Sequence, residues 1–427
     1  MPNHSAALHD GIRQAGEIAQ LKLKRVNIAE RLCRLTGQGI ERDSILLGKA
    51  TERPQANGQV AGQDSTEAVV FGGRIYWFWG DTNRLKYPLG NSQMSGATSA
   101  LPAEKDERAN GIAFTYFTGD DGFVRPMWPL PDGVAPGTLV WADGHLAAPD
   151  ASGREQMLAH YAHLRSLDQP LEHGLGVWDQ EKEEFRRVRK LPNAETWRFP
   201  KGHPVRGRGG LADYFLFRAT REDHAPFPMV RAVATIEALT EPDAYEAFTC
   251  FRPGSDEVER DQAGEIVWGW KRDARPLTQK EEAQLISAGK LRSEEARWQV
   301  RDIETGAPVF FHAGSICWNE FRQSWVIIAA EAGAGRLGEI WFSEAAEPTG
   351  PWEWARKIVT HDRYSFYNPV QHAFLDQQGG RVIHFEGTYA TTFSSAPAPT
   401  PRYDYNQILY RLDLADPRLP QPLRPLR

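Results

Sequence analysis

The sequence predicts an all-β fold, a five-bladed β-propeller, because one apolar hairpin recurs five times along the chain. In each copy, an apolar strand is followed by a glycine or polar turn and then by an aromatic or β-branched strand that ends in a charged residue. A third candidate strand follows every hairpin, and a fourth often comes after it. Four short strands repeated five times are typical of propeller blades.

This repeat places the strands along the chain. The hairpins are expected at 64–83, 138–165, 202–218, 312–331 and 368–386. Third strands are expected at 96–101, 173–179, 230–236, 338–344 and 406–412, and fourth strands at 185–191, 245–251 and 352–359. The chain also contains 38 Gly and 29 Pro, which suit the many turns that short strands need.

The two ends of the chain are expected to close the ring together. Residues 1–30 are interpreted as an N-terminal helix or tail, and residues 31–427 as the propeller domain. The C-terminal segment PRLPQPLRPLR is too rich in proline to form a strand. The segment 31–40 is therefore expected to supply the last strand of the fifth blade.

Two insertions interrupt the repeat. Residues 84–96 follow Asp81 directly, so we expect a loop over the rim at that point. Residues 256–308 are rich in charge and contain a helix signal, with Thr278 as N-cap and Glu281 as its capping-box partner. This short helix is expected to lie outside the blades, either covering one side of the cleft or decorating the surface.

Composition excludes several classes of function. The 427 residues are 41% apolar and 25% charged, as in a globular chain, and the net charge of −6 leaves no basic face for nucleic acid or an anionic membrane. Three cysteines are too few for a disulfide framework or a zinc site. We expect no cofactor and no bound metal. With no signal peptide or bilayer-spanning segment, the chain as written is expected to be cytoplasmic, or extracytoplasmic if a leader is missing.

Paired acids are the strongest chemical signal. In an antiparallel hairpin the start of the first strand lies beside the end of the second, so Asp64 and Asp81 should meet at one rim. Cleavage of a glycosidic bond generally needs a pair of carboxyl groups that lie close together. Each aspartate could instead cap a turn. Glu386, in HFEGTY, is the third candidate acid, with an ion pair to a rim arginine as the alternative.

Further polar and aromatic residues are expected to face the same mouth. Some start or end the inner hairpins, and others cluster in AETWRFPKGHP, SFYNPVQHAF and TPRYDYNQILY. Aromatic faces and amides together suit sugar rings and their hydroxyls, although ordinary strand alternation would also place tyrosines in the core. The candidate substrate-binding residues are Glu195, Arg198, His203, Arg218, Glu331, Tyr367, Asn368, Tyr403, Asp404 and Asn406.

The segment 64–83, in which Asp64 precedes an apolar strand, a glycine turn and an aromatic strand ending in GDT, resembles the first blade of five-bladed propeller glycoside hydrolases. It is most similar to the family that includes bacterial endo-D-arabinanases. Residues 343–359 also resemble the third and fourth strands of arabinanase, xylosidase and fructosidase propellers. The resemblance implies that Asp64 and Asp81 are catalytic. The helical insertion departs from the family pattern.

The sequence therefore favours a carbohydrate-active enzyme, a glycoside hydrolase that acts on an oligo- or polysaccharide. One of Asp64 and Asp81 would activate water or attack the anomeric carbon, while the other, or Glu386, would protonate the leaving oxygen. Two alternatives remain open. The first is a non-catalytic propeller that binds a glycan or a protein. The second is a phosphate-dependent glycoside phosphorylase whose anion site uses Arg198, Lys201 and His203.

Overall fold

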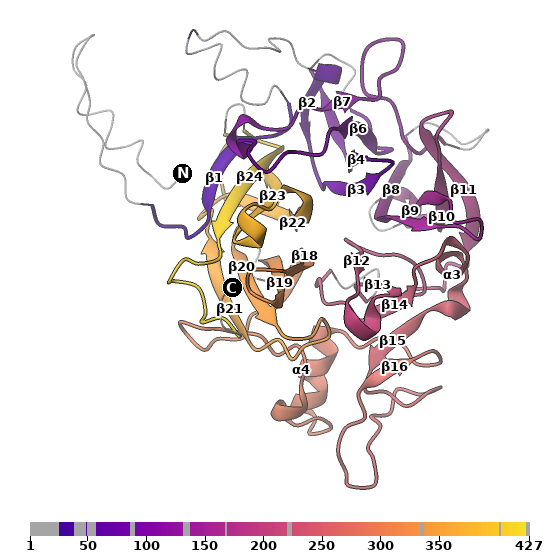
Figure 1. The fold of residues 1–427 in the computed structure, drawn as a ribbon, viewed down its shortest axis with the longest axis vertical. Helices are drawn as coiled ribbons and strands as arrows, with labels where there is room; N and C mark the ends of the chain where they lie inside the picture. Colours follow the sequence, from indigo (N-terminus) through magenta and orange to yellow (C-terminus); the bar gives the residue numbers. More distant parts are fainter. Residues whose placement is uncertain are drawn as a thin grey trace.

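The computed structural model is a ring of five β-sheets arranged around a central axis (Figure 1). It describes residues 25–37, 48, 57–85, 90–130, 137–166, 169–219, 224–333, 337–400 and 403–423. The predicted five-bladed propeller is confirmed, and each predicted hairpin is an antiparallel strand pair. The helix or tail expected at the N-terminus falls mostly on residues 1–24, which lie outside the described residues.

Blades 1 and 2 are four-stranded antiparallel sheets. Blade 1 contains β3 (Glu67–Phe71), β4 (Arg74–Trp79), β6 (Ser95–Ser99) and β7 (Thr115–Tyr116). Blade 2 contains β8 (Leu139–Pro149), β9 (Glu155–Ser166), β10 (Gln169–Asp179) and β11 (Glu184–Leu191). A separate two-stranded ladder, β2 (Val60–Gln63) with β5 (Thr82–Arg84), continues the hairpin of blade 1 on the other side of Asp64 and Asp81.

Blades 3 and 4 each carry a fifth strand. Blade 3 contains β12 (Val205–Arg206), β13 (Tyr214–Phe217), β14 (Val230–Val233), β15 (Glu246–Thr249) and β16 (Gly269–Lys271), with α3 (Ile236–Thr240) between β14 and β15. Blade 4 contains β18 (Phe311–Asn319), β19 (Ser324–Glu331), β20 (Ile340–Ala345), β21 (Trp354–Val359) and β17 (Arg301–Asp302). In both blades the extra strand comes from the insertion 256–308.

Blade 5 closes the ring with strands from both ends of the chain. It contains β22 (Ser365–Gln371), β23 (Val382–Ala390), β24 (Asn406–Asp413) and β1 (Glu30–Arg34). The N-terminal strand β1 runs antiparallel to β24, from the pair Glu30 and Arg411 to the pair Arg34 and Ile408. The closure predicted for the segment 31–40 is therefore confirmed, although β1 is short and already starts at Glu30.

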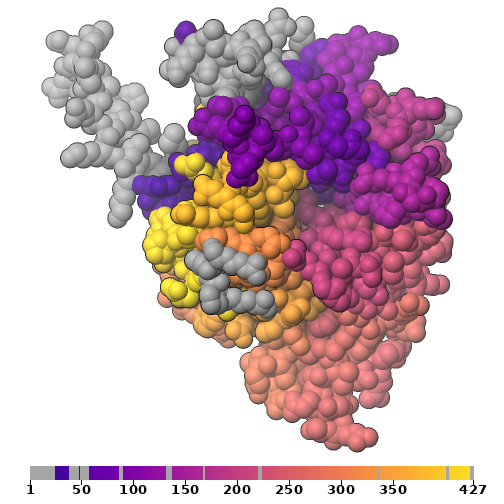
Figure 2. All heavy atoms as spheres, viewed as in Figure 1, coloured from indigo at the N-terminus to yellow at the C-terminus, as the bar shows by residue number. Residues whose placement is uncertain are grey.

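The insertion 256–308 also adds one strand to each of two blades, which the sequence analysis did not predict. β16 pairs with β15, and β17 pairs in parallel with β21, because the outer edges of these two sheets leave backbone groups free to pair. The helix α4 (Gln279–Ser287) is outside the sheets, and the predicted capping box of Thr278 and Glu281 is present. Figures 1 and 2 show the insertion projecting beyond the ring, away from the axis.

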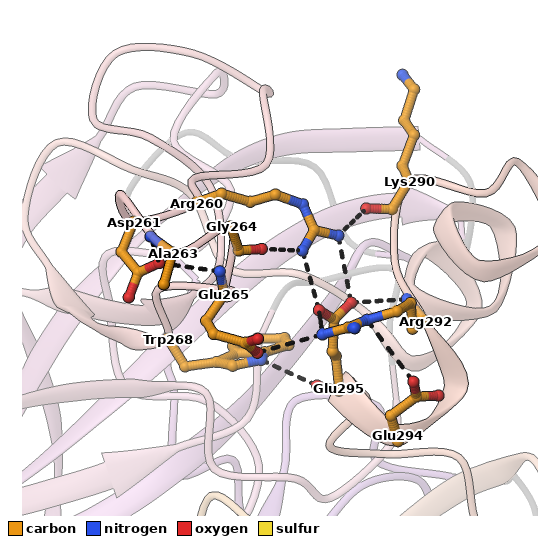
Figure 3. Close-up of polar contacts among 10 residues, drawn as sticks. All are labelled: Arg260, Asp261, Ala263, Gly264, Glu265, Trp268, Lys290, Arg292, Glu294 and Glu295. Carbon is orange, nitrogen blue, oxygen red and sulfur yellow. Dashed lines mark hydrogen bonds and ion pairs between the residues drawn. The ribbon is translucent and has the colours of Figure 1, made fainter.

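Charged side chains hold the loops of the insertion together (Figure 3). The guanidinium groups of Arg260 and Arg292 both donate to the Glu295 carboxylate, at 2.9 Å and 2.6 Å. Arg260 also donates to the carbonyl oxygens of Gly264 and Lys290. Because these bonds join the hairpin after β15 to the segment after α4, they fix the insertion as one unit at the edge of the ring.

Apolar side chains fill the spaces between neighbouring blades. Trp77, Trp79, Trp128, Trp298 and Trp352 are fully buried, so these indoles serve packing and do not form an open sugar-binding surface. Where the structure describes the chain, it has no helix long and apolar enough to span a bilayer.

The ring closure can be tested at Thr36, which follows β1. Its hydroxyl donates to Asn406 Oδ1 at 3.0 Å and accepts from the Gln407 backbone N–H at 3.0 Å, in a buried position. Thr36→Val keeps the shape but leaves both partners unpaired, so we expect a loss of about 1–3 kcal/mol in the free energy of unfolding, measured by urea denaturation. The exposed Thr115→Val variant is the control. Equal stability of the two variants would contradict the role of Thr36.

Candidate active site

Asp64 and Asp81 lie side by side in the gap between two antiparallel ladders. On one side Gln63 of β2 pairs with Thr82 of β5, and on the other Glu67 of β3 pairs with Phe78 of β4. In between, the Asp64 N–H donates to the Asp81 carbonyl at 3.2 Å, and the Asp81 N–H donates to Asp64 Oδ1 at 2.8 Å. The expected meeting of the two aspartates is confirmed. Their catalytic role stays a prediction.

Glycine is required next to this pair. A Cβ atom at Gly80 would lie 2.5 Å from Asp64 Oδ1, a contact shorter than real Cβ atoms make. The Gly80 N–H also donates to the Asp64 carbonyl at 2.9 Å. The WGD sequence that ends the second strand therefore lets the Asp64 carboxylate approach the backbone closely.

Blade 5 supplies the partners of the Asp64 carboxylate. The hydroxyl of Tyr367, on β22, donates to Asp64 Oδ2 at 3.2 Å, and Tyr405 forms a second hydrogen bond. Burial, followed by the negative charge of Asp81, raises the pKa of Asp64 to about 7, although these hydrogen bonds act in the opposite direction. Asp64 is therefore a carboxyl group that is partly protonated at neutral pH.

Asp81 is half-buried and faces blade 2. Trp141, on β8, places its indole Nε1 3.5 Å from Asp81 Oδ1, and Ser92 forms a second side-chain hydrogen bond. Burial raises the pKa of Asp81, while these two hydrogen bonds oppose the rise. Ser92 belongs to the loop 84–96 that was predicted to follow Asp81. The described part of this loop thus returns to the Asp81 carboxylate, as expected.

A second group of charged side chains lies on neighbouring inner strands. Glu67 Oε2 lies 3.6 Å from His145 Nδ1, and Glu67 Oε1 lies 3.6 Å from His203 Nδ1. Burial and the negative charge of Asp143 raise the pKa of Glu67 well above its usual value, despite nearby cations. These interactions favour the protonated form of Glu67.

Asp143 has the opposite electrostatic environment. Its Oδ2 lies 2.7 Å from Lys201 Nζ and 3.5 Å from Arg218 Nη2. Burial alone would raise the pKa of Asp143, but these cations and the hydrogen bond with His160 outweigh it and hold the pKa well below the usual range. His160 Nε2 forms a hydrogen bond of 2.9 Å with His173 Nδ1, and His173 Nε2 forms one of 2.8 Å with the Pro192 carbonyl oxygen. This buried chain fixes the position of Asp143.

Sequence reasoning missed Glu67, Asp143 and His145. Asp143 lies at a register shift in β8, where the residues up to Leu146 leave the regular ladder. Gly144 has a φ of 68°, and a Cβ atom there would lie 2.6 Å from the Pro200 backbone. An Asp-Gly pair inside an apolar strand is a signal for such a bulge, and a bulge can redirect a side chain toward the axis.

Comparison with known proteins supports the fold. No protein-family model matches the chain, and no curated protein matches it either. The structure resembles that of a candidate hydrolase from Bacteroides ovatus ATCC 8483, with a TM-score of 0.52 and 13% identity over 93% of this chain and 96% of that chain. The likeness is one of fold.

Two solved structures of named enzymes are more distant. An exo-β-1,3-galactanase from Phanerochaete chrysosporium, solved with galactose, gives a TM-score of 0.41 at 9% identity, covering 83% of this chain and 61% of that chain. A GH43_1 enzyme from Xanthomonas citri, solved with xylotriose, gives 0.39 at 11% identity, covering 82% and 86%. The finer resemblance of residues 64–83 to the endo-D-arabinanase family stays a prediction.

Some of the predicted binding residues surround these carboxylates. Tyr367 contacts Asp64, and Asn368 Nδ2 donates to Ser65 Oγ at 2.7 Å. His203 and Arg218 face Glu67 and Asp143. Asp404, the residue before Tyr405, accepts hydrogen bonds from the hydroxyl of Tyr364 and from the Thr391 N–H. The hairpins of blades 3 and 5 thus deliver side chains to the acids of blades 1 and 2.

Other predicted residues have partners outside this group. Glu195 and Arg198 pair with each other at 3.1 Å. The Glu331 carboxylate accepts from Trp341 Nε1 at 3.1 Å within blade 4. Tyr403 stacks under Arg31 and Arg34, and Asn406 bonds Thr36 in a buried position. Glu331 ends the second strand of blade 4, one strand spacing from the inner strand, so its side chain meets the neighbouring strand β20 first.

Glu386 is buried and fully engaged. Its Oε1 lies 2.6 Å from His372 Nε2, and its Oε2 accepts from Thr66 Oγ1 at 3.2 Å. Its partner is therefore a histidine of its own blade and not the rim arginine considered above. At 1% exposure, Glu386 is placed to hold the segment 64–67 and not to touch a sugar. Within the described ranges, no three His, Cys, Asp or Glu side chains gather in a way that could hold a metal ion.

The raised pKa of Asp64 predicts a pH-dependent stability. A carboxyl group whose pKa is about 3.9 in the unfolded chain and about 7 in the folded one stabilises the fold at low pH, and this contribution is lost as the pH rises between these values. Asn does not titrate, so the stability of Asp64→Asn relative to wild type should be higher at pH 8 than at pH 4, by roughly 3–4 kcal/mol.

Urea denaturation at the two pH values measures this difference. The matched control is Asp243→Asn, at an exposed position of blade 3. If both variants change equally with pH, the shifted titration of Asp64 is wrong.

Proposed function

We propose that this protein is a glycoside hydrolase that cleaves an oligo- or polysaccharide with Asp64 and Asp81. The observation that carries the proposal is that Asp64 and Asp81 lie side by side across one hairpin, where the Asp64 N–H donates to the Asp81 carbonyl and the Asp81 N–H donates to the Asp64 carboxylate. Hydrolysis of a glycosidic bond needs one carboxyl that gives a proton and one carboxylate that acts on water or carbon. The surroundings of Asp64 and Asp81 differ, which supports a division of these two roles between them.

Asp64 is the better proton donor. Its pKa of about 7 keeps a substantial protonated fraction at neutral pH, and Tyr367 and Tyr405 hold its oxygen atoms in place. Asp81 has a more exposed carboxylate, which Trp141 and Ser92 stabilise by hydrogen bonds. We assign Asp81 as the base that activates water or as the nucleophile at the anomeric carbon.

The second charged group is suited to binding the sugar. Protonated Glu67 can donate a hydrogen bond to a hydroxyl, and His203 is close enough to act on the same hydroxyl. The opposed pKa shifts of Glu67 and Asp143 also favour a second assignment, with Glu67 as the acid. Because Lys201 and Arg218 already neutralise Asp143 and His160 forms a hydrogen bond with it, Asp143 is less available than Asp81 for attack.

Hydrolysis is favoured over phosphorolysis. The residues considered for a phosphate site already contact carboxylates of the same chain, Lys201 at Asp143, Arg198 at Glu195 and His203 at Glu67. Because of the resemblance of residues 64–83 to endo-D-arabinanases, D-arabinan belongs in the first screen, together with galactans and xylans. Release of reducing ends without added phosphate would separate hydrolysis both from phosphorolysis and from binding alone.

Substitution of the pair tests the catalytic assignment. Asp64→Asn and Asp81→Asn should each lower kcat/KM by roughly 10²- to 10⁴-fold with the fold intact, because each removes a proton-transfer or nucleophilic group. The assay is reducing-end release from the glycan found in the screen. Glu331→Gln, in blade 4, is the control and should keep full activity. Turnover retained in Asp81→Asn, with a complete loss in Glu67→Gln, would transfer the assignment to the second group.

The pH profile offers an independent test through Tyr367. Its hydrogen bond stabilises the Asp64 carboxylate, so Tyr367→Phe should raise the pKa of Asp64 further. If Asp64 acts as the acid, the alkaline limb of kcat/KM moves to higher pH, by about half a unit to one unit. Tyr403→Phe serves as the control, since Tyr403 contacts Arg31 and Arg34. A limb that stays in place, or moves to lower pH, would argue against this role.

A further inference from the structure

An exposed aromatic side chain stands next to the shell of the Asp64 carboxylate. Phe393, in the turn after β23, is 59% exposed. Its φ of 61° lies in the left-handed region, which bulky residues other than glycine rarely adopt. Exposure of the ring and strain in the backbone are both unfavourable for folding, and such strain is concentrated at sites of function.

The Phe393 ring meets the ring of Tyr367 edge-on, with their centroids 5.7 Å apart. The hydroxyl of Tyr367 donates to Asp64. One tyrosine ring, comparable in size to a sugar ring, therefore separates Phe393 from the proposed acid. A glycan bound with its scissile bond at Asp64 would bring its next ring toward Phe393.

Phe393 also borders a hollow of about 220 Å³, lined in addition by Tyr364, Arg363, Asp362 and the hydroxyl-bearing Ser394 and Ser395. The Tyr364 hydroxyl contacts Asp404, and the neighbouring Tyr405 bonds Asp64, so the hollow and the acid share one short segment of chain. The charged groups at the hollow are Glu339, Asp362 and Arg363. This balance suits the hydroxyls of a neutral sugar better than a uronate carboxylate.

We propose that Phe393 is the stacking platform of a second sugar subsite and that the hollow beside it takes the hydroxyls of that ring. The proposal rests on the proposed function and extends it: the substrate is a chain of neutral sugars, and its second ring is recognised at blade 5. A flat apolar ring face lying on an aromatic ring explains why Phe393 is exposed and why its strained turn is tolerated.

Binding is best measured without turnover. The probes are arabino-, galacto- and xylo-oligosaccharides, from disaccharide to hexasaccharide, titrated by calorimetry into Asp81→Asn with and without Phe393→Ala. We expect the Phe393→Ala change to weaken binding of the longer oligosaccharides roughly tenfold and to leave the disaccharide nearly unchanged. Trp354→Ala, at a 47% exposed aromatic residue on β21, is the matched control.

Kinetics on the active enzyme give the second readout. Phe393→Ala should raise KM for long substrates and keep kcat, because the platform lies outside the reacting bond. Phe393→Trp should restore binding, which a purely structural role would not require. Equal weakening of short and long probes, unchanged binding of the long ones, or no binding of any probe would overturn the proposal. If length-dependent binding needs Phe393 but wild type releases no product, the subsite stands and the proposed hydrolase function fails.

Discussion

The antiparallel pairing of residues 60–71 with residues 74–84 is the interaction on which the candidate site depends. Between its two ladders, the Asp64 N–H donates to the Asp81 carbonyl and the Asp81 N–H donates to the Asp64 side chain. A shift of one residue would turn every side chain of the hairpin to the opposite face. The register therefore places both acids together, and Gly80 leaves the space that the Asp64 carboxylate needs.

Ring closure makes this local arrangement into a site. Tyr367 and Tyr405 come from blade 5, whereas Asp64 belongs to blade 1. The tyrosines that bond to this carboxylate are therefore far from it in sequence, and Tyr367 is separated from Asp64 by 303 positions. Blade 5 is complete because β1 pairs with β24. Gln407, on β24, also donates to the Gln63 carbonyl next to Asp64. The stability of the closing strand and the geometry of the acids are consequently linked.

The sequence carries the signals for regular elements and loses them at irregular ones. Alternating apolar runs and glycine turns located the five hairpins, and Thr278 with Glu281 located α4, because these signals depend on neighbours along the chain. Asp143 and His145 were missed because the register shift in β8 redirects them within a run that looks like a regular strand. Glu331 was misplaced for the converse reason: its position in the repeat was correct, but Trp341 binds it within blade 4.

The separation of the two charged groups has a chemical consequence. Lys201 and Arg218 contact Asp143, and the interactions that shift the pKa of Asp64 are burial, the charge of Asp81 and neutral donors. A cation beside Asp64 would stabilise its carboxylate and remove the proton that a general acid must deliver. By keeping both cations at Asp143, the fold leaves Asp64 with a high pKa, although Glu67 on the following strand belongs to the charged group. The same burial destabilises the ionised form of Asp64 above neutral pH, so the feature that suits this residue to acid catalysis also lowers the stability of the fold there.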